Sequence, residues 1–125
     1  MKAPSSYELK IIKILQKENI PFKREERIDK FWGSLYRMDF TLLLDKEKIF
    51  IEVDGEQHFQ PIYGKPTLLK QQEHDRRKNS FCLGNEIKLY RLPYWELDNI
   101  NSLSDILQDK FLVHSKWHND NIVAK

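Results

Sequence analysis

Two β-rich segments joined by a short polar turn constrain the fold of this 125-residue chain most strongly. They are residues 36–44, YRMDFTLLL, and residues 48–54, KIFIEVD, and their composition and spacing predict an antiparallel hairpin. One register makes a whole face of this hairpin apolar, whereas a slip of one residue mixes apolar and charged side chains on both faces. The pairs of that register are Leu44 with Ile49, Leu42 with Ile51 and Phe40 with Val53.

The other face of the predicted hairpin carries three acids at one end. The same register places Asp39, Glu52 and Asp54 on this face, with Asp39 directly opposite Asp54. Like charges on directly opposed residues, whose Cβ atoms are ~5 Å apart, destabilise a sheet. Two explanations follow: the carboxylates splay into solvent at an open sheet end, or a positive charge lies between them.

The rest of the chain predicts an α/β domain with a mixed central sheet, an antiparallel hairpin and flanking helices in the order αβββαβα. Periodicity and end signals place these elements along a single domain, 1–125. The expected elements are a helix over 7–19 capped by Ser5 or Ser6, a weak strand within 21–30, a turn at 31–35, a helix over 67–85, a strand over 87–93 and an amphipathic closing helix over 99–114.

Two acids lie on the apolar stripes of the predicted helices. Glu8 shares a stripe with Ile11, Ile12 and Leu15, and Asp75 lies between apolar ends of its own stripe. For Glu8 there is a simpler explanation, because the helix dipole favours a solvated glutamate in a first turn. Both interpretations of Glu8 stay open at this level.

Composition excludes several classes of protein. The net charge is only +2, so any nucleic-acid binding must depend on local basic patches. Cys82 is the only cysteine, which excludes an internal disulfide and a cysteine-rich zinc site. The sequence has no apolar run long enough to cross a bilayer and no apolar segment of a secretory signal at its start, so we expect a cytoplasmic protein.

The acids at the hairpin end suit a hard divalent cation. Mg²⁺ prefers oxygen ligands and is commonly held by one or two carboxylates together with substrate phosphate oxygens. Asp39 and Glu52 would be ligands, the backbone carbonyl of Val53 would lie within reach, and His58 could move a proton. Gly55 would let the chain turn sharply after the strand, so that His58 returns over the site.

The residues RMDF, IEVDGEQHF, HDRRKN and IKLYRLPY together resemble the PD-(D/E)xK nuclease superfamily. Within it they are most similar to the branch of very-short-patch-repair endonucleases and related phage homing nucleases, which has an E-D-x-H-D arrangement. The resemblance implies a restriction-endonuclease-like fold and a metal-dependent DNA endonuclease. It implies Mg²⁺ as cofactor, with Mn²⁺ able to substitute, and DNA as partner. A domain this small has little room for a separate sequence-reading module, so three alternatives stay open: it recognises DNA structure, works as a homodimer, or takes its specificity from a partner protein.

The resemblance also assigns roles to individual residues. It makes Glu8 the acid of the first helix, Asp39 the metal-binding aspartate, Glu52 the second acid, Val53 the source of a carbonyl ligand, His58 the general base and Asp75 the acid that orients it. The chain departs from the superfamily at Asp54, which stands where a lysine is usual. Asp54 could instead widen the metal site. Lys78 could supply the charge, although its spacing puts it off the stripe of Asp75.

Basic and aromatic residues offer candidate contacts to DNA. The candidates for phosphate binding are Arg37, Arg76, Arg77 and Lys78. A run of three basic residues is also common on a solvated helix face. Phe31, Trp32 and Tyr36 could stack on bases or pack in the core. The alternative to an enzyme is a degenerate nuclease fold that only binds DNA or serves as a subunit of a larger complex.

Overall fold

A four-stranded mixed sheet organises the computed structural model, which describes residues 2–28 and 36–114. The strand order is β1-β2-β3-β4, in which β1, β2 and β3 pair antiparallel and β4 lies parallel to β3. The predicted α/β class and the order αβββαβα are confirmed. The elements are α1 (Ser6–Lys17), β1 (Phe22–Arg27), β2 (Arg37–Leu44), β3 (Glu47–Asp54), η2 (Glu56–His58), α2 (Lys65–Gly84), β4 (Lys88–Pro93), η3 (Tyr94–Asn99), α3 (Leu103–Ile106) and η4 (Asp109–Phe111).

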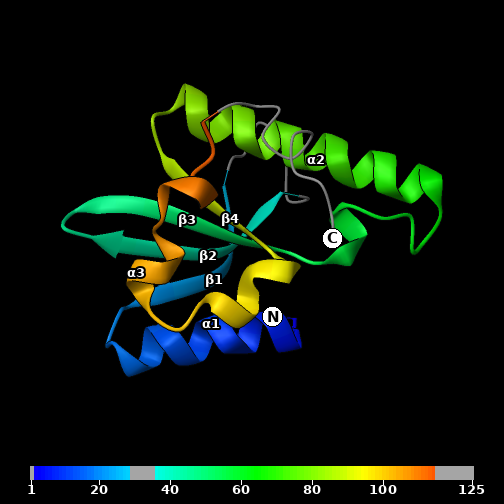
Figure 1. Ribbon diagram of the computed structural model, residues 1–125. Coiled ribbons are helices and arrows are strands. Elements are labelled where there is room, and N and C mark those ends of the chain that lie inside the picture. Colours follow the sequence, from blue (N-terminus) through cyan, green and yellow to red (C-terminus); the bar gives the residue numbers. More distant parts are fainter. Residues whose placement is uncertain (1, 29–35, 115–125) are drawn as a thin grey trace.

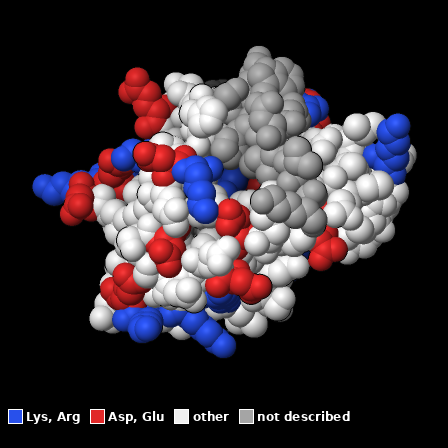
Figure 2. Space-filling view, viewed as in Figure 1, with Lys and Arg blue, Asp and Glu red and all other residues white. Residues whose placement is uncertain are grey.

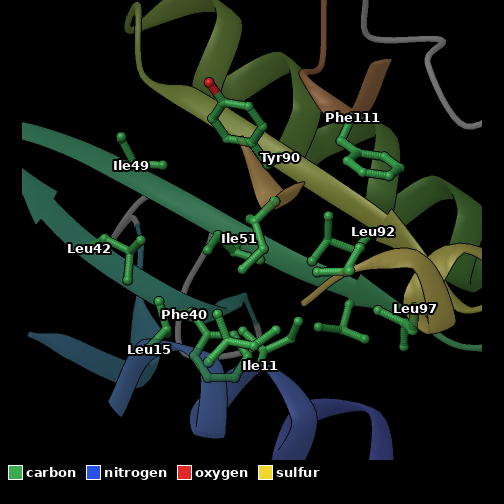
Figure 3. Close-up of a cluster of buried hydrophobic side chains, with 14 residues drawn as sticks. Ile11, Leu15, Phe40, Leu42, Ile49, Ile51, Tyr90, Leu92, Leu97 and Phe111 are labelled. Carbon is green, nitrogen blue, oxygen red and sulfur yellow. The ribbon is translucent and has the colours of Figure 1, made fainter. Parts of the chain in front are cut away.

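Helices cover the two faces of the sheet. Figure 1 shows α1 on one side of the strands and α2 on the other. Ile11 and Leu15 of α1 point into a cluster that includes Phe40, Ile51 and Leu92 from the sheet (Figure 3). A second cluster lies on the α2 side and contains Met38, Phe50, Cys82, Leu89 and Val113. Both faces of the sheet are therefore buried, and the acids of β2 and β3 lie close to these clusters.

The hairpin register differs from the predicted one by two residues. The structure pairs Leu42 with Ile49 and Phe40 with Ile51. Asp45 and Lys46 form the turn, with φ angles of 49° and 67°. Two residues with positive φ form a type I′ turn, whose twist matches that of the flanking strands. This short turn replaces the four-residue loop that the predicted register requires.

The two-residue shift preserves the faces of the hairpin but changes the opposed acids. Side chains alternate along a strand with period two, so the predicted apolar face remains apolar. The prediction that Asp39 lies opposite Asp54 is wrong. Continuing the observed pairing from Phe40 and Ile51 by one step places Asp39 beside Glu52. The acids that the register brings together are therefore Asp39 and Glu52.

The predicted closing helix over 99–114 is also wrong in its extent. Only α3, of four residues, forms within it. Leu112 then makes an antiparallel bridge with Tyr90, and the Val113 amide donates a hydrogen bond of 2.9 Å to the Leu89 carbonyl. Because β4 is an edge strand, its free backbone groups bind the returning chain. Ile100 and Ile106 of the segment are still buried, and its leucines are partly buried against the same core, without a continuous helix.

Some expectations concern residues outside the described part of the chain. The turn at 31–35, with Phe31 and Trp32, belongs to these. Tyr36 is described and is buried, with 4% of its surface exposed, so it packs rather than presents a ring to solvent. Among the described residues, no helix combines the length and apolarity that a membrane span requires.

Candidate functional site

A cleft of about 430 Å³ opens beside the first residues of β2 and the last residues of β3. The start of α1, η2 and α2 complete its lining. It collects residues that lie far apart in the sequence. Those that matter for its chemistry are Glu8, Asp39, Glu52, Val53, His58, Gln71 and Lys78. The cleft thus collects the five residues Glu8, Asp39, Glu52, Val53 and His58, predicted to be catalytic or to bind metal, and Lys78, predicted to contact phosphate. Asp75 and Asp54 do not line it, and both lie in a buried cluster against His58.

Asp39 lies where the regular pairing of β2 breaks. The ladder with β1 pairs Phe40 and Met38 but omits the pair of Asp39 with Glu25, and Glu25 has a φ of 54°. Met38 and Phe40 accordingly pack in different hydrophobic clusters, although they are two residues apart. The Asp39 carboxylate accepts a hydrogen bond of 2.8 Å from the Val53 amide. A side-chain oxygen therefore binds this backbone donor and holds the acid against β3.

Asp39 and Glu52 form an acid pair at the end of the hairpin. Glu52 is 3% exposed, and Asp39 beside it is half-buried. Burial and the neighbouring Glu52 raise the pKa of Asp39 well above its usual value. Burial would also raise the pKa of Glu52, but Lys78 and the hydrogen bond with Asp39 lower it. Of the two acids, Asp39 is therefore the one that takes up a proton more readily, and Glu52 the one that keeps its negative charge to lower pH.

Lys78 provides the positive charge of this site, and the prediction that its spacing keeps it away is wrong. Its Nζ lies 2.5 Å from Glu52 Oε1 and donates a 2.6 Å hydrogen bond to the Arg37 carbonyl. The side chain is largely buried, at 15% exposed. A lysine has a long, flexible stem, so its ammonium group can reach a site that its Cα does not face.

His58 belongs to a second buried cluster that borders the first. Its Nδ1 lies 2.8 Å from Asp75 Oδ2 and 3.5 Å from Asp54 Oδ1. Gln71 donates a further hydrogen bond of 3.1 Å to Asp75. Because Nδ1 is engaged by carboxylates behind the ring, Nε2 is the nitrogen left for the cleft that His58 lines.

Arg91 is the residue of this cluster that the sequence prediction missed. Its Nη1 lies 2.8 Å from Asp54 Oδ1 and 3.6 Å from Asp75 Oδ1, and its Nε donates a 2.7 Å hydrogen bond to Asn79. The side chain is fully buried. A signal was present in the sequence, since the strand IKLYRLP was expected to be buried. An arginine within such a strand needs anionic partners.

Arg91 also determines what Asp54 can do. Oxygen and nitrogen atoms of Asp54, His58 and Asp75 lie within 4.8 Å of one another, a spacing that could hold a metal ion. The Arg91 guanidinium, however, already contacts both carboxylates. Burial would raise the pKa of Asp75, but Arg91 and His58 lower it to about 2. The cluster thus contains its own cation, and the structure places Asp54 with Arg91 and His58 instead of with Asp39.

The charge of His58 makes the stability of the fold depend on pH. Burial alone would lower the pKa of His58, but Asp54 and the hydrogen bond with Asp75 raise it above 6.5. Protonated His58 therefore stabilises the native state fully below about pH 6.5, and this contribution disappears as the pH rises through the higher folded-state pKa. We expect the stability advantage of the wild type over His58→Gln to shrink as the pH rises from about 6.5 through the folded-state pKa of His58.

Urea denaturation of both proteins across this range measures the difference. His74 is present in both proteins, and its pKa is lowered, first by burial and then by Lys70, so its opposite pH dependence cancels in the comparison. An advantage of the wild type that grows as the pH rises would contradict the prediction.

Glu8 takes part in two features of the structure, the cap of α1 and the lining of the cleft. Its carboxylate accepts a 2.8 Å hydrogen bond from the Ser5 amide, and Ser5 Oγ accepts one of 3.1 Å from the Glu8 amide. This reciprocal pair is a capping box, which satisfies two free amides at the start of α1. The same carboxylate lines the cleft. The sequence alternatives for Glu8, a first-turn residue and a site residue, therefore do not exclude each other.

The remaining candidates for DNA contact are distributed unevenly. Arg76 and Arg77 both pair with Glu73, at 3.0 Å and 3.1 Å, and Arg77 also donates to the Tyr36 hydroxyl. Arg37 is exposed at the start of β2. Two of the predicted phosphate contacts are thus already engaged with an acid on their own helix.

These contacts define what the site can do chemically. An acid pair with an adjacent lysine can bind a cation and a phosphate, and a histidine oriented by carboxylates can move a proton.

The assignment of a function to this protein depends on the geometry of the site alone. Comparison of the chain with protein-family models, curated proteins and solved structures gives no match.

Proposed function

We propose that this protein is a metal-dependent endonuclease that hydrolyses phosphodiester bonds in DNA and has a restriction-endonuclease-like fold. One observation carries the proposal: the half-buried Asp39 and the buried Glu52 line one open cleft together with Lys78, whose ammonium group pairs with Glu52. An ion pair that only stabilises the fold needs one acid for one lysine, and Glu52 is that acid. Asp39 is an additional acid, held in place by its hydrogen bond from the Val53 amide, and it fits a site that binds a cation.

The residues present fit Mg²⁺ or Mn²⁺. The donor set consists of carboxylate oxygens, which these hard cations prefer. Burial and the neighbouring Glu52 raise the pKa of Asp39, as expected of an acid pair with too little positive charge beside it. Asp39 and Glu52 would hold the metal, with the Val53 carbonyl and water as further ligands. When bound, the metal would stabilise charge on the phosphate and acidify a bound water.

The protein side chains would perform the other tasks. Lys78 would place a positive charge beside the phosphate, from α2 instead of from the strand position that Asp54 occupies. His58 would accept or deliver a proton through Nε2, while Asp75 holds Nδ1 at 2.8 Å. Glu8, which also lines the cleft, would order water.

Relaxation of supercoiled plasmid tests the proposal. We expect conversion to open-circle or linear DNA with Mg²⁺ or Mn²⁺ and no conversion with EDTA, because the acid pair needs the cation to act on a phosphate. The ratio of the two products shows whether one or both strands are cut. Retention of DNA on a gel without conversion in any metal would contradict the enzyme and favour the degenerate binding module.

The variant Glu8→Gln separates the two roles of Glu8. Glutamine can keep the capping box, so the unfolding free energy should change by less than about 1 kcal/mol, the contribution of one charge near a helix end. DNA cleavage should slow by roughly 10–100-fold, as for residues that orient a metal site. Urea denaturation and initial cleavage rates measure the two effects.

The matched control is Ser5→Ala, which removes the other half of the capping box and keeps the Glu8 charge. It should lower stability by about 1 kcal/mol and leave the cleavage rate of the folded protein near that of the wild type. If Glu8→Gln cleaves as fast as the wild type, Glu8 is a capping residue only.

A further inference from the structure

We propose that a cluster of four aromatic residues beside the cleft binds unpaired bases, so that the enzyme acts on single-stranded or locally unpaired DNA. The base-binding cluster consists of Tyr7, Phe59, Tyr94 and Trp95. This inference deepens the proposed function and rests on it in one respect, namely that the cleft receives the scissile phosphate.

The rings of the base-binding cluster form a continuous chain of contacts. Trp95 lies with its ring centroid 4.8 Å from that of Phe59 and 5.2 Å from that of Tyr94. Tyr94 in turn lies 6.4 Å from Tyr7, with an angle of 30° between the ring planes. These rings come from α1, from the chain after η2 and from η3. The tertiary fold alone therefore assembles this surface.

The cluster is continuous with the cleft. Tyr7 belongs to both, because it lines the cleft beside Glu8. On the other side, the Phe59 ring centroid lies 6.4 Å from that of His58, which also lines the cleft. A DNA strand whose phosphate reaches Asp39 and Glu52 would thus pass its neighbouring bases over these rings.

The rings remain accessible even though they touch one another. Each of the four residues is partly exposed, whereas the aromatic residues Phe40 and Phe50 of the sheet are buried. Bases stack on such surfaces with little regard to sequence, because every base has a π-face. An accessible group of aromatic rings beside a phosphate site therefore suits a strand whose bases are not paired.

The charge distribution argues against binding through the duplex backbone. Duplex binding depends on many phosphate contacts from lysine and arginine. Here Arg76 and Arg77 pair with Glu73, Lys78 pairs with Glu52, and the net charge is +2. On the face in Figure 2, acidic and basic side chains are interspersed. Three of the four predicted phosphate contacts are thus engaged with acids, so we expect contacts with bases to supply part of the affinity.

Oligonucleotide binding without metal tests the inference independently of cleavage. In EDTA, a labelled oligothymidylate should bind more tightly than a duplex of equal length, as measured by fluorescence anisotropy. Trp95→Leu should weaken oligothymidylate binding by about tenfold or more, which corresponds to the loss of one stacked base. The matched control is Tyr63→Leu, which removes a ring that is 72% exposed and outside the cluster, and it should bind like the wild type.

A second measurement needs no variant. Oligothymidylate should quench part of the tryptophan fluorescence of the wild type, because a stacked base contacts the Trp95 ring. Absence of quenching, equal affinity for duplex, or equal weakening by Trp95→Leu and Tyr63→Leu would each overturn the inference. Circular dichroism of both variants confirms that they are folded.

The proposed function and this inference can fail separately. Metal-dependent cleavage of plasmid combined with a preference for duplex in EDTA would keep the nuclease and reject the base-binding cluster. Tight oligothymidylate binding that Trp95→Leu weakens, without cleavage in any metal, would keep the cluster and reject the nuclease.

Discussion

Replacement of Asp39 by asparagine should reduce DNA cleavage by about a thousandfold or more, because a metal ion contributes several kcal/mol of transition-state stabilisation. Asparagine has nearly the same shape, and its carbonyl oxygen can still accept the 2.8 Å hydrogen bond from the Val53 amide. The fold should therefore survive. Because the pKa of Asp39 is raised by burial and by Glu52, a neutral side chain is also tolerated electrostatically.

Three measurements separate this outcome from a loss of structure. Initial cleavage rates with saturating Mn²⁺ give the catalytic effect, calorimetric titration with Mn²⁺ gives metal affinity, and urea denaturation gives stability. The control is Asp98→Asn, which makes the same chemical change at an exposed aspartate of η3 outside the cleft. Asp98→Asn should cleave like the wild type. Cleavage by Asp39→Asn at the rate of the control would refute the metal site.

Replacement of Arg91 by leucine should destabilise the protein by about 3–5 kcal/mol, the usual effect of removing one partner of a buried ion pair. Asp54 and Asp75 would lose their guanidinium partner while both remain almost fully buried. His58 is the other group of this cluster that contacts both carboxylates and can carry a positive charge. It would have to balance two carboxylates with at most one positive charge.

The destabilisation should also depend on pH in a defined direction. Arg91 lowers the pKa of both buried acids, so we expect the folded-state pKa values of Asp54 and Asp75 to be higher in the variant than in the wild type. Protonation then stabilises the folded state, so the deficit of Arg91→Leu should become smaller as the pH falls. Urea denaturation at a series of pH values measures this trend.

Lys88→Leu is the matched control for Arg91→Leu. It removes a cation from the same strand, β4, but its ion pair with Glu47, at 3.2 Å, is about half exposed. Exposed ion pairs contribute about 0–1 kcal/mol. If Arg91→Leu loses no more stability than Lys88→Leu, the buried cluster does not hold the fold in the way described.

Local patterns in the sequence were sufficient to predict the order of the helices and strands. Several features depend only on residues close to them in the sequence. They are the apolar runs of β2 and β3, the Ser5 cap of α1 and the end of α2 at Gly84. Alternation with period two also predicted which side chains share a face of the hairpin. These features depend on backbone conformation and on contacts between near neighbours.

Details that depend on competition between local and distant contacts were predicted less well. The pattern over 99–114 fits a helix, but the free edge of β4 binds Leu112 and Val113 and ends that helix early. The hairpin register was wrong by two residues because both registers bury the same face. The positive φ angles of Asp45 and Lys46, which select the tight turn, leave only a weak trace in the sequence.

The acids themselves could be read from the sequence, because charged residues at the end of an apolar strand and on the stripe of a helix conflict with burial unless they have partners. The positively charged partners of these acids could not be predicted from the sequence. Lys78 reaches Glu52 from a helix 26 residues further along the chain, and Arg91 joins Asp54 and Asp75 from the parallel strand β4. Sequence periodicity describes the direction of a side chain from its own element. Which opposite charge it meets depends on how helix and sheet pack, and only the tertiary structure decides that.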